Sequence, residues 1–396
     1  MDRHIFPKHR TTSMQLAVFA EDFYPAINGG ALLQWRICQV AAQDGHDVTV
    51  FTAKTSETRC LSQVDGVKIH RPMRAKPESA EGYEPHAVLY RIAFSLYTFF
   101  YAYRWFSRND VDGIYASSLS LHWVAKVLSR FKDVPVVNFV GGTPSARSEF
   151  QWTPKFFLER LNFRFWLGDF VYCQASRVAN VIQTAGNNVE TTPGIVNAEA
   201  IRMADKSSDR EAFRREWGFD SDDIILSFVG RLVPLKNPDT ALDIVAGLPD
   251  RYKLVVVGDG PMFDQLENTV EQCGLSDRIR FTGVLEHDLA LETVAATDAV
   301  LLTSDFESHP TVVYEGLTLG KHVFATPVGT IPETDYPRLH AGTVDELPEI
   351  IQETEWKPLE TYDEEALAKY SIESSTRAIL ETMESLRTTQ QSSEVA

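Results

Sequence analysis

Two glutamates flank the start of a predicted helix in the segment FESHPTVVYEGLTLG, which follows a buried strand. Glu307 precedes this helix, and Glu315 lies about two turns inside it. The helix start, at His309, Pro310 and Thr311, offers unpaired backbone N–H groups and a partial positive charge, where an anion such as a diphosphate could bind. The two carboxylates could then accept hydrogen bonds from a sugar and from a ribose on either side. The alternative is two solvated glutamates around an ordinary helix start.

Two cations follow another buried strand in the segment FVGRLVPLKN. Gly230 and Arg231 come directly after the strand, and Lys236 comes five residues after Arg231. Ligands bind at the carboxyl edge of an open parallel sheet, and Arg and Lys there can neutralise a departing diphosphate without a metal. The alternative is a pair of surface cations beside a loop. This interpretation is weaker because so acidic a chain clusters few cations in its turns.

A third segment, FYPAINGGALLQW, places Gly29 and Gly30 at the start of a predicted helix. Their small size lets backbone amides approach a phosphate or an acceptor closely. The spacing is not the G-x-G-x-x-G of a dinucleotide site, which argues against a nicotinamide or flavin enzyme. We interpret the glycine-rich segment VVVGDGP at 255–261 as a plain turn.

Short β-branched runs bounded by turn residues alternate with helix-length spacers in two series. The runs lie at 15–20, 47–52, 112–116, 134–140 and 180–184, and then at 223–229, 252–257, 278–281, 299–303 and 322–325. Continuous apolar strands of this kind predict α/β architecture with two doubly wound parallel sheets in tandem. We expect a flexible leader over 1–14, a first domain over 15–195, a second over 196–365, and a C-terminal helix over 366–396 with a frayed end.

Composition excludes several classes of protein. The 396 residues carry 38 Lys and Arg against 55 Asp and Glu, a net charge of −17 that argues against nucleic-acid binding and fits a halophile-like proteome. No apolar run is long enough to span a membrane, and the basic N-terminus lacks the apolar core of a secretory signal. The four cysteines have no paired spacing, so we interpret them as reduced packing residues of a cytoplasmic protein.

The second half of the chain resembles the donor-binding domain of retaining glycosyltransferases of family 4, which have the GT-B fold. The resemblance rests on GRLVPLKN, VVVGDGP, RIRFTGVL, the two spaced glutamates and TPVGTIPE, in the family's order. It implies two Rossmann-like domains facing a cleft, with a closing helix that packs back on the N-terminal, acceptor-side domain. It also implies metal-independent hexosyl transfer, with retention, from a nucleoside-diphosphate sugar to a hydroxyl of a lipid-linked or glycan acceptor, with no separate cofactor.

The same resemblance implies a role for each matching residue. Arg231 and Lys236 would hold the diphosphate, Glu307 the sugar hydroxyls, Glu315 the ribose, and the main chain at Val284 and Leu285 the base. The catalytic set is then Arg231, Lys236 and Glu307, and the donor-binding set is Gly29, Gly30, Gly230, Val284, Leu285, His309, Pro310, Thr311 and Glu315.

One position departs from the family pattern. Gly141, in NFVGGTPS, stands where the family usually has a histidine near the reacting sugar. His122 lies on an apolar run and is better interpreted as a packed core residue. Gly141 therefore leaves a non-catalytic nucleotide-sugar binding protein open as an alternative. Another GT-B enzyme such as a nucleotide-sugar epimerase is a second alternative, which would need acid or base side chains that the sequence does not identify.

A predicted helix from Leu89 to Arg108 is aromatic on nearly every face and has arginines near its ends. Trp, Tyr and Arg suit the headgroup zone of a bilayer, which predicts contact with the inner face of the membrane or with a lipid-linked acceptor. The alternative is a buried helix of the first domain.

Overall fold

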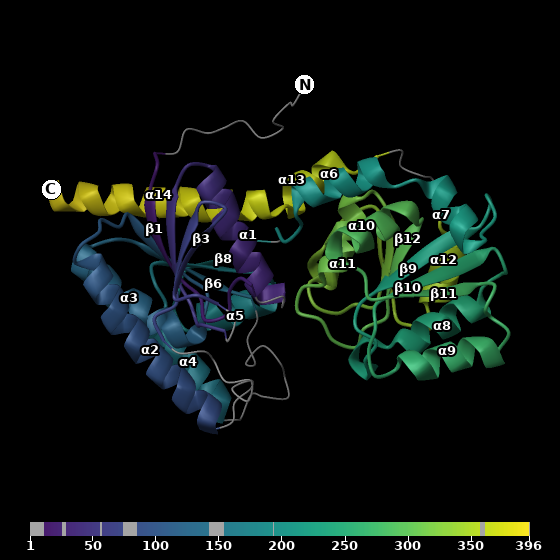
Figure 1. Cartoon of the computed structure of the whole chain (residues 1–396), viewed down its shortest axis with the longest axis horizontal. Helices are drawn as coiled ribbons and strands as arrows, with labels where there is room; N and C mark the ends of the chain where they lie inside the picture. The colour runs from purple at the N-terminus through teal and green to yellow at the C-terminus, as the bar shows by residue number, and fades with distance from the viewer. Residues whose placement is uncertain are drawn as a thin grey trace. The chain divides into compact units, whose positions relative to one another are not determined.

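A computed structural model describes residues 12–25, 29–55, 58–73, 85–141, 154–192, 194–356 and 361–395. The chain divides into two compact units (Figure 1). Unit 1 comprises residues 1–193 together with 372–396, and unit 2 comprises residues 194–371. The C-terminal segment therefore belongs to the same unit as the N-terminal half of the chain.

Unit 1 is built on one sheet with the strand order β3-β4-β2-β1-β5-β6-β7-β8, in which only the β3–β4 pair is antiparallel among the described strands. Its strands are β1 (Gln15–Phe19), β2 (Asp47–Phe51), β3 (Leu61–Val64), β4 (Val67–His70), β5 (Gly113–Ala116), β6 (Val136–Val140), β7 (Phe170–Cys173) and β8 (Val189–Thr191). Its helices are α1 (Gly29–Gln43), α2 (Pro85–Phe106), α3 (His122–Lys132), α4 (Pro154–Trp166), α5 (Ser176–Thr184) and α14 (Ile372–Val395).

Unit 2 is built on a parallel sheet with the strand order β11-β10-β9-β12-β13-β14. Its strands are β9 (Ile224–Val229), β10 (Tyr252–Val257), β11 (Ile279–Gly283), β12 (Ala299–Leu302), β13 (His322–Ala325) and β14 (Leu339–Ala341). Its helices are α6 (Ala198–Ser207), α7 (Arg210–Trp217), α8 (Pro238–Gly247), α9 (Phe263–Gln272), α10 (His287–Ala296), α11 (Thr311–Thr318), α12 (Leu347–Glu353) and α13 (Glu364–Tyr370).

The strands of unit 2 are buried on both faces, which explains their continuous apolar runs. Within β12, Ala299 and Leu301 pack into one core cluster, whereas Val300 and Leu302 pack into another on the opposite face of the sheet. The helices cover both faces of this sheet (Figure 1). Two doubly wound sheets, parallel except for the β3–β4 pair, are therefore present, as the alternation of elements predicts.

Three expectations from the sequence are wrong in detail. Residues 180–184, predicted as a strand, are the end of α5, because Val178 and Ile182 are four residues apart and both buried on one helical face. The single helix expected over 366–396 is two helices, α13 and α14, separated by Ser371, and α14 extends to Val395. Of the four cysteines, all free, Cys60 and Cys273 are exposed and are not packing residues.

Helix α14 packs against α1 and β6 within unit 1 (Figure 1). The side chain of Met383 is fully buried there, and the hydroxyl of Tyr172 on β7 donates to the carbonyl oxygen of Ala378 at 3.1 Å. A Cβ atom on Gly113, at the start of β5, would lie 2.1 Å from Met383 Sδ, so the helix leaves no room for a side chain there.

Candidate functional site

The order of strands reverses between β9 and β12 in unit 2. From β9 the chain continues outward to β10 and β11, and it then crosses to β12, β13 and β14 on the other side. In an open parallel sheet such a reversal leaves a crevice at the carboxyl ends of the two strands, where ligands bind. Gly230 and Arg231 follow β9 at this point, and the segment 303–310 follows β12.

Lys236 and Glu307 form an ion pair across this crevice, between Lys236 Nζ and Glu307 Oε1. The hydroxyl of Ser304 also donates to Glu307 Oε1 at 3.0 Å. Both charged side chains are largely buried, with 28% of Lys236 and 13% of Glu307 exposed. Arg231 lies on the same loop with an exposed side chain and makes no ion pair with any described residue. The structure thus pairs Lys236 with Glu307 and places Arg231 on the same loop as Lys236.

The two loops that carry this pair are bound to each other. Asn237 adopts a left-handed conformation with φ +46°, and its amide donates to Asp305 Oδ1 at 2.6 Å. The Thr303 hydroxyl donates to the carbonyl oxygen of Asn237 at 2.8 Å, and the Asp305 N–H donates to the carbonyl oxygen of Leu235 at 3.0 Å. These bonds fix the spacing between Lys236 and Glu307 before any ligand binds.

The start of α11 is held by the side chain of His309. This ring is buried and stacks on Tyr314 with 4.3 Å between centroids, and His309 Nδ1 lies 2.9 Å from Thr330 Oγ1. Tyr314 OH also contacts Thr330 Oγ1 at 2.6 Å. Pro310 is the N-cap, and Thr311 is the first helical residue. His309 therefore positions the helix start, a role that its sequence position alone did not reveal.

Glu315 is buried inside α11, and its Oε1 lies 2.8 Å from His287 Nε2. His287 is the first residue of α10 and follows the segment that contains Val284 and Leu285. Val284 is 74% exposed, whereas Leu285 packs partly against the core. The predicted base-binding segment and the predicted ribose-binding residue are thus linked through His287, which the sequence analysis missed because a histidine at a helix start is not a distinctive signal.

The glycine-rich turn after β10 packs directly on the loop after β9. A Cβ atom on Gly258, which has φ +136°, would lie 2.0 Å from the carbonyl oxygen of Gly230. The turn at 258–260 is therefore part of the support of the candidate site.

We expect Gly258→Ala to destabilise unit 2 by about 2–4 kcal/mol, because alanine is strained at this φ and clashes with the backbone at Gly230. Thermal or urea unfolding measures this change. Gly247→Ala is the matched control, since a Cβ there has open space and should leave stability nearly unchanged. An unchanged unfolding midpoint for Gly258→Ala would contradict the close approach.

Gly29 and Gly30 are the first residues of α1 in unit 1, as the sequence predicts. Gly141 follows β6, and a Cβ there would lie 3.3 Å from the Phe139 ring. His122 is 1% exposed, its Nδ1 lies 2.9 Å from Asn162 Oδ1, and burial lowers the pKa of its ring to about 4. This neutral, buried histidine is a core residue.

Unit 1 has a reversal of its own, between β1 and β5, and a cavity of about 610 Å³ opens beside it. Glu21, which follows β1, accepts from Arg91 Nε at 3.1 Å and from the Ser120 hydroxyl at 2.7 Å. The Glu21 N–H donates to the hydroxyl of Ser118, which follows β5, at 2.7 Å. Val88 and Ile92 of α2 and Leu158 of α4 form an apolar part of the same cavity. The cavity is thus polar at the sheet and apolar between the helices.

An apolar stripe runs along the exposed side of α2. Its members recur three or four residues apart, which places them on one face: Leu89, Ile92, Leu96, Phe100 and Tyr103. Leu158, Leu161 and Phe165 form a similar exposed stripe on α4. The described helices include none that is both long enough and apolar enough to cross a bilayer. The described residues also include no group of three His, Cys, Asp or Glu side chains that could hold a metal ion.

Comparison with known proteins finds a family similarity for the part of unit 2 that contains the candidate site. Residues 209–335 match the glycosyl transferases group 1 family. This group 1 segment contains Gly230, Arg231, Lys236, Glu307 and Glu315. Over 337 residues, 81% of this chain and 82% of its relative, the chain is 22% identical to an uncharacterized glycosyltransferase of Methanocaldococcus jannaschii.

Solved structures of low sequence identity share the whole fold. Sucrose-phosphate synthase from Thermosynechococcus elongatus matches 96% of this chain and 98% of its own, with a TM-score of 0.66 and 16% identity. HepE of Anabaena, in complex with UDP, matches 96% of this chain and 99% of its own, with a TM-score of 0.62 and 18% identity. The chain has the GT-B fold, and with the group 1 match these similarities support a nucleotide-sugar-dependent glycosyltransferase.

Proposed function

We propose that this chain is a metal-independent retaining glycosyltransferase of family 4 that moves a hexose from a nucleoside-diphosphate sugar to an acceptor hydroxyl. One observation carries the proposal: the Lys236–Glu307 ion pair lies with Arg231 at the β9/β12 reversal, just before the start of α11. Two cations and a helix N-terminus form an anion site, and a carboxylate within it can orient sugar hydroxyls. HepE binds UDP, which makes uridine donors the first to test.

In the proposed reaction the bond between the anomeric carbon and the diphosphate oxygen breaks, and negative charge grows on the diphosphate. Arg231, Lys236 and the N–H groups at the start of α11 stabilise that charge, and they are oriented before the reaction begins. The acceptor hydroxyl attacks from the same face, and its proton passes to the leaving phosphate oxygen. This proton route requires no protein base, so a glycine at 141 is compatible with catalysis.

The remaining donor contacts are assigned by the resemblance to family 4 glycosyltransferases. Glu315 accepts from the ribose hydroxyls, and the main chain at Val284 and Leu285 contacts the base. Gly29 and Gly30 of α1 contribute backbone N–H groups to the phosphates. His287 keeps the Glu315 carboxylate in one orientation through its bond to Oε1.

Release of nucleoside diphosphate tests this function. A panel of nucleotide sugars identifies the donor by thermal shift, and the diphosphate is then measured with and without hydroxyl acceptors. We expect release that depends on the acceptor, retained anomeric configuration in the product, and full activity in EDTA. Donor binding without release would indicate a binding protein, and an isomerised donor would indicate an epimerase. Activity abolished by EDTA and restored by magnesium would contradict the metal-free mechanism.

We propose further that the acceptor is lipid-linked and reaches unit 1 at the inner face of the membrane. The unit 1 cavity joins a carboxylate, at Glu21, to an apolar lining from α2 and α4, and so suits an acceptor with a hydroxylated head and an aliphatic chain. The exposed stripe on α2 includes Leu89 at 66% and Phe100 at 67% exposure. Monomeric soluble proteins rarely expose large contiguous apolar patches, and the exposed Arg104 on the same helix suits anionic lipid.

Replacing both Phe100 and Arg104 by serine should weaken binding to anionic vesicles at least about tenfold. The double variant loses the burial of one aromatic side chain in the lipid and the attraction of one cation to the anionic headgroups. Co-sedimentation at low salt measures the binding. Met203→Ser is the matched control, since Met203 is also exposed, at 59%, but lies on α6 of unit 2. Two results together would contradict the proposal: the wild type does not bind vesicles, and the double variant keeps its activity on lipid acceptors. The stripe would then have a structural role, and a soluble acceptor would be favoured.

A further inference from the structure

A second charged site lies at the opposite, amino-terminal edge of the unit 2 sheet. Four neighbouring parallel strands begin there, and a charged residue directly precedes each: Asp223 before β9, Asp298 before β12, Lys321 before β13 and Arg338 before β14. They line a cavity of about 270 Å³ together with Arg210 and Arg214, which are four residues apart on α7. Four cations and two carboxylates therefore meet at one cavity.

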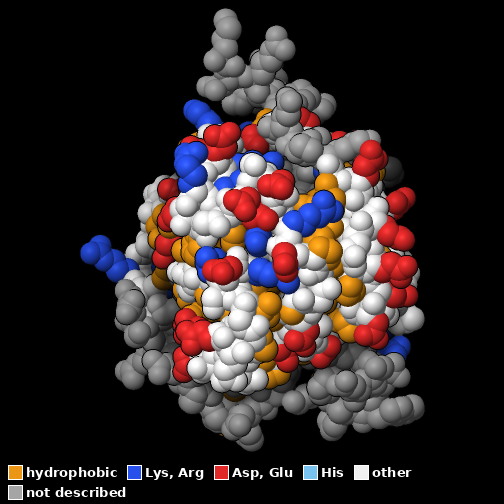
Figure 2. All heavy atoms as spheres, turned by 90° about the vertical axis from the view of Figure 1, so that its right-hand side faces the viewer, with side chains coloured by type: hydrophobic (Ala, Val, Ile, Leu, Met, Phe, Trp, Pro, Cys, Tyr) orange, Lys and Arg blue, Asp and Glu red, His pale blue; other side chains and the backbone are white. Residues whose placement is uncertain are grey.

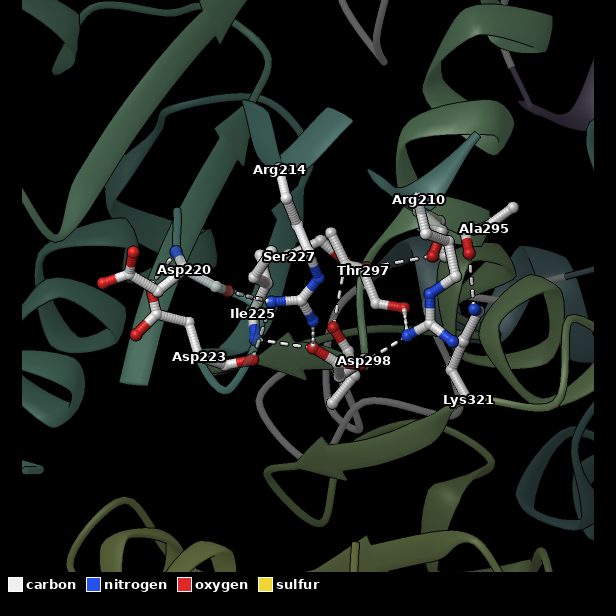
Figure 3. A network of polar contacts seen from close by, with 12 residues as sticks. Arg210, Arg214, Asp220, Asp223, Ile225, Ser227, Ala295, Thr297, Asp298 and Lys321 are labelled. Carbon is white, nitrogen blue, oxygen red and sulfur yellow. Dashed lines mark hydrogen bonds and ion pairs between the residues drawn. The ribbon is translucent and has the colours of Figure 1, made fainter. Parts of the chain in front are cut away.

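Asp298 is fully engaged by its neighbours. Arg210 Nη2 contacts Asp298 Oδ1, while Arg214 Nη2 donates to Oδ2 at 2.9 Å and the Ile225 N–H donates to Oδ2 at 2.8 Å. Figure 3 shows the Asp298 carboxylate between the two guanidinium groups, with the Lys321 ammonium beside Arg210. The single negative charge of Asp298 thus neutralises only one of the two arginine charges.

Asp223 neutralises little of the remaining positive charge at the cavity. Its Oδ2 accepts from the Asp220 N–H at 2.8 Å, and its Oδ1 lies 3.7 Å from Lys253 Nζ. Its charge is therefore shared with a fifth cation that does not line the cavity.

Lys321 is 7% exposed and donates to the carbonyl oxygen of Ala295 at 2.5 Å. That carbonyl belongs to the end of α10, which supplies about half a negative charge and so balances less than one cation. Burial, and then the neighbouring charge of Arg210, lower the pKa of Lys321 to about 7. The positive charges of Lys321 and Arg210 thus repel each other in a partly buried cavity.

We propose that this cavity binds a small doubly charged oxyanion, a phosphate or sulfate group, independently of the donor site. The cations that line it exceed the acids by two, four against two, in a chain of net charge −17. Figure 2 shows one face of the molecule, on which Lys and Arg side chains gather beside Asp and Glu near the centre. Arginine presents several donors in a fixed fork that matches the oxygens of such a group.

Two further acids act on these cations from outside the lining of the cavity. Asp205 acts on Lys321 and Asp363 acts on Arg338, and both interactions favour the charged forms of the cations, but neither acid lines the cavity. Asp363 is also occupied as the N-cap of α13, where it accepts from two backbone N–H groups.

Isothermal titration with inorganic phosphate and with sulfate, at constant ionic strength, tests the proposal. We expect saturable binding to the wild type, and at least about tenfold weaker binding for Arg338→Gln and for Lys321→Met. Arg215→Gln is the matched control. Arg215 lies on α7, the helix of Arg210 and Arg214, but it is 69% exposed and does not line the cavity. Lys236→Ala should also keep this binding, which separates it from phosphate binding at the donor site. No saturable binding, or equal loss in Arg215→Gln, would overturn the proposal.

The pH dependence of sulfate affinity provides a test in the wild type. A bound anion stabilises the protonated form of Lys321, so affinity should be greatest below about pH 7 and should fall as pH rises through that value. Arg210 and Arg338 lower the pKa of Lys321, whereas Asp298 and Asp205 raise it. Burial lowers the pKa of His322 to about 4, so this neighbour remains neutral. An affinity unchanged between pH 6 and 8, or a fall that persists in Lys321→Met, would contradict the assignment.

Discussion

Lys236→Ala is expected to lower kcat/KM by a factor of about 10²–10³, or about 2.7–4 kcal/mol of transition-state stabilisation. Lys236 is held opposite Glu307 by the bonded loops after β9 and β12, so its charge is in place before the diphosphate leaves. Arg231→Ala should have an effect of similar size. Because Arg231 has an exposed side chain, its removal should leave folding stability unchanged.

Steady-state kinetics with the identified donor measure both effects, and thermal unfolding of each variant separates catalysis from folding. Arg215→Ala is the matched control, because Arg215 is an exposed arginine of the same unit that lies on α7. If kcat/KM for both Lys236→Ala and Arg231→Ala stayed within about threefold of the wild type, the electrostatic mechanism would be rejected.

Glu315→Ala is expected to weaken binding of the nucleoside diphosphate at least about tenfold, whereas Glu307→Ala should reduce turnover far more than nucleotide affinity. Glu315 lies inside α11 and is bonded to His287, next to the proposed base-binding segment. Glu307 lies before the helix and is bonded to Lys236 and Ser304. The ribose and the transferred sugar are therefore expected at separate carboxylates.

Titration with the diphosphate, beside turnover of the full donor, separates the two roles. His287→Ala gives an independent check: it should weaken diphosphate binding less than Glu315→Ala, because the carboxylate remains but loses its fixed orientation. An equal loss of diphosphate affinity in Glu307→Ala and Glu315→Ala would reject the assignment.

The sequence was sufficient to predict the elements that position the donor site, because apolar runs in a parallel sheet are uninterrupted. Segments such as 252–257 and 322–325 have the same bounds in the structure as in the prediction. β7, with the sequence FVYC, was missed because it lies inside a longer aromatic segment where helical and strand patterns overlap. The short edge strands β3, β8 and β14 carry too few residues for a period to show.

The contacts that complete the site could not be predicted, because they join residues far apart in the chain. The bonds of Glu315 to His287 and of His309 to Thr330 depend on the packing of α11 against its neighbours. The same holds for Glu21, whose partners Arg91 and Ser120 come from two later elements. Spacing along one segment reports only neighbours on the same helix or strand.

The packing of α14 in unit 1 has a consequence for the order of biosynthesis. Residues 1–193 leave the ribosome before unit 2, yet the helix that covers Gly113 and buries Met383 is made only after unit 2. A nascent chain therefore holds an incomplete first unit while residues 194–371 are translated and fold. Chains that terminate before residue 372 leave the groove of α14 open, so proteolysis and chaperones can distinguish truncated chains from finished ones at unit 1.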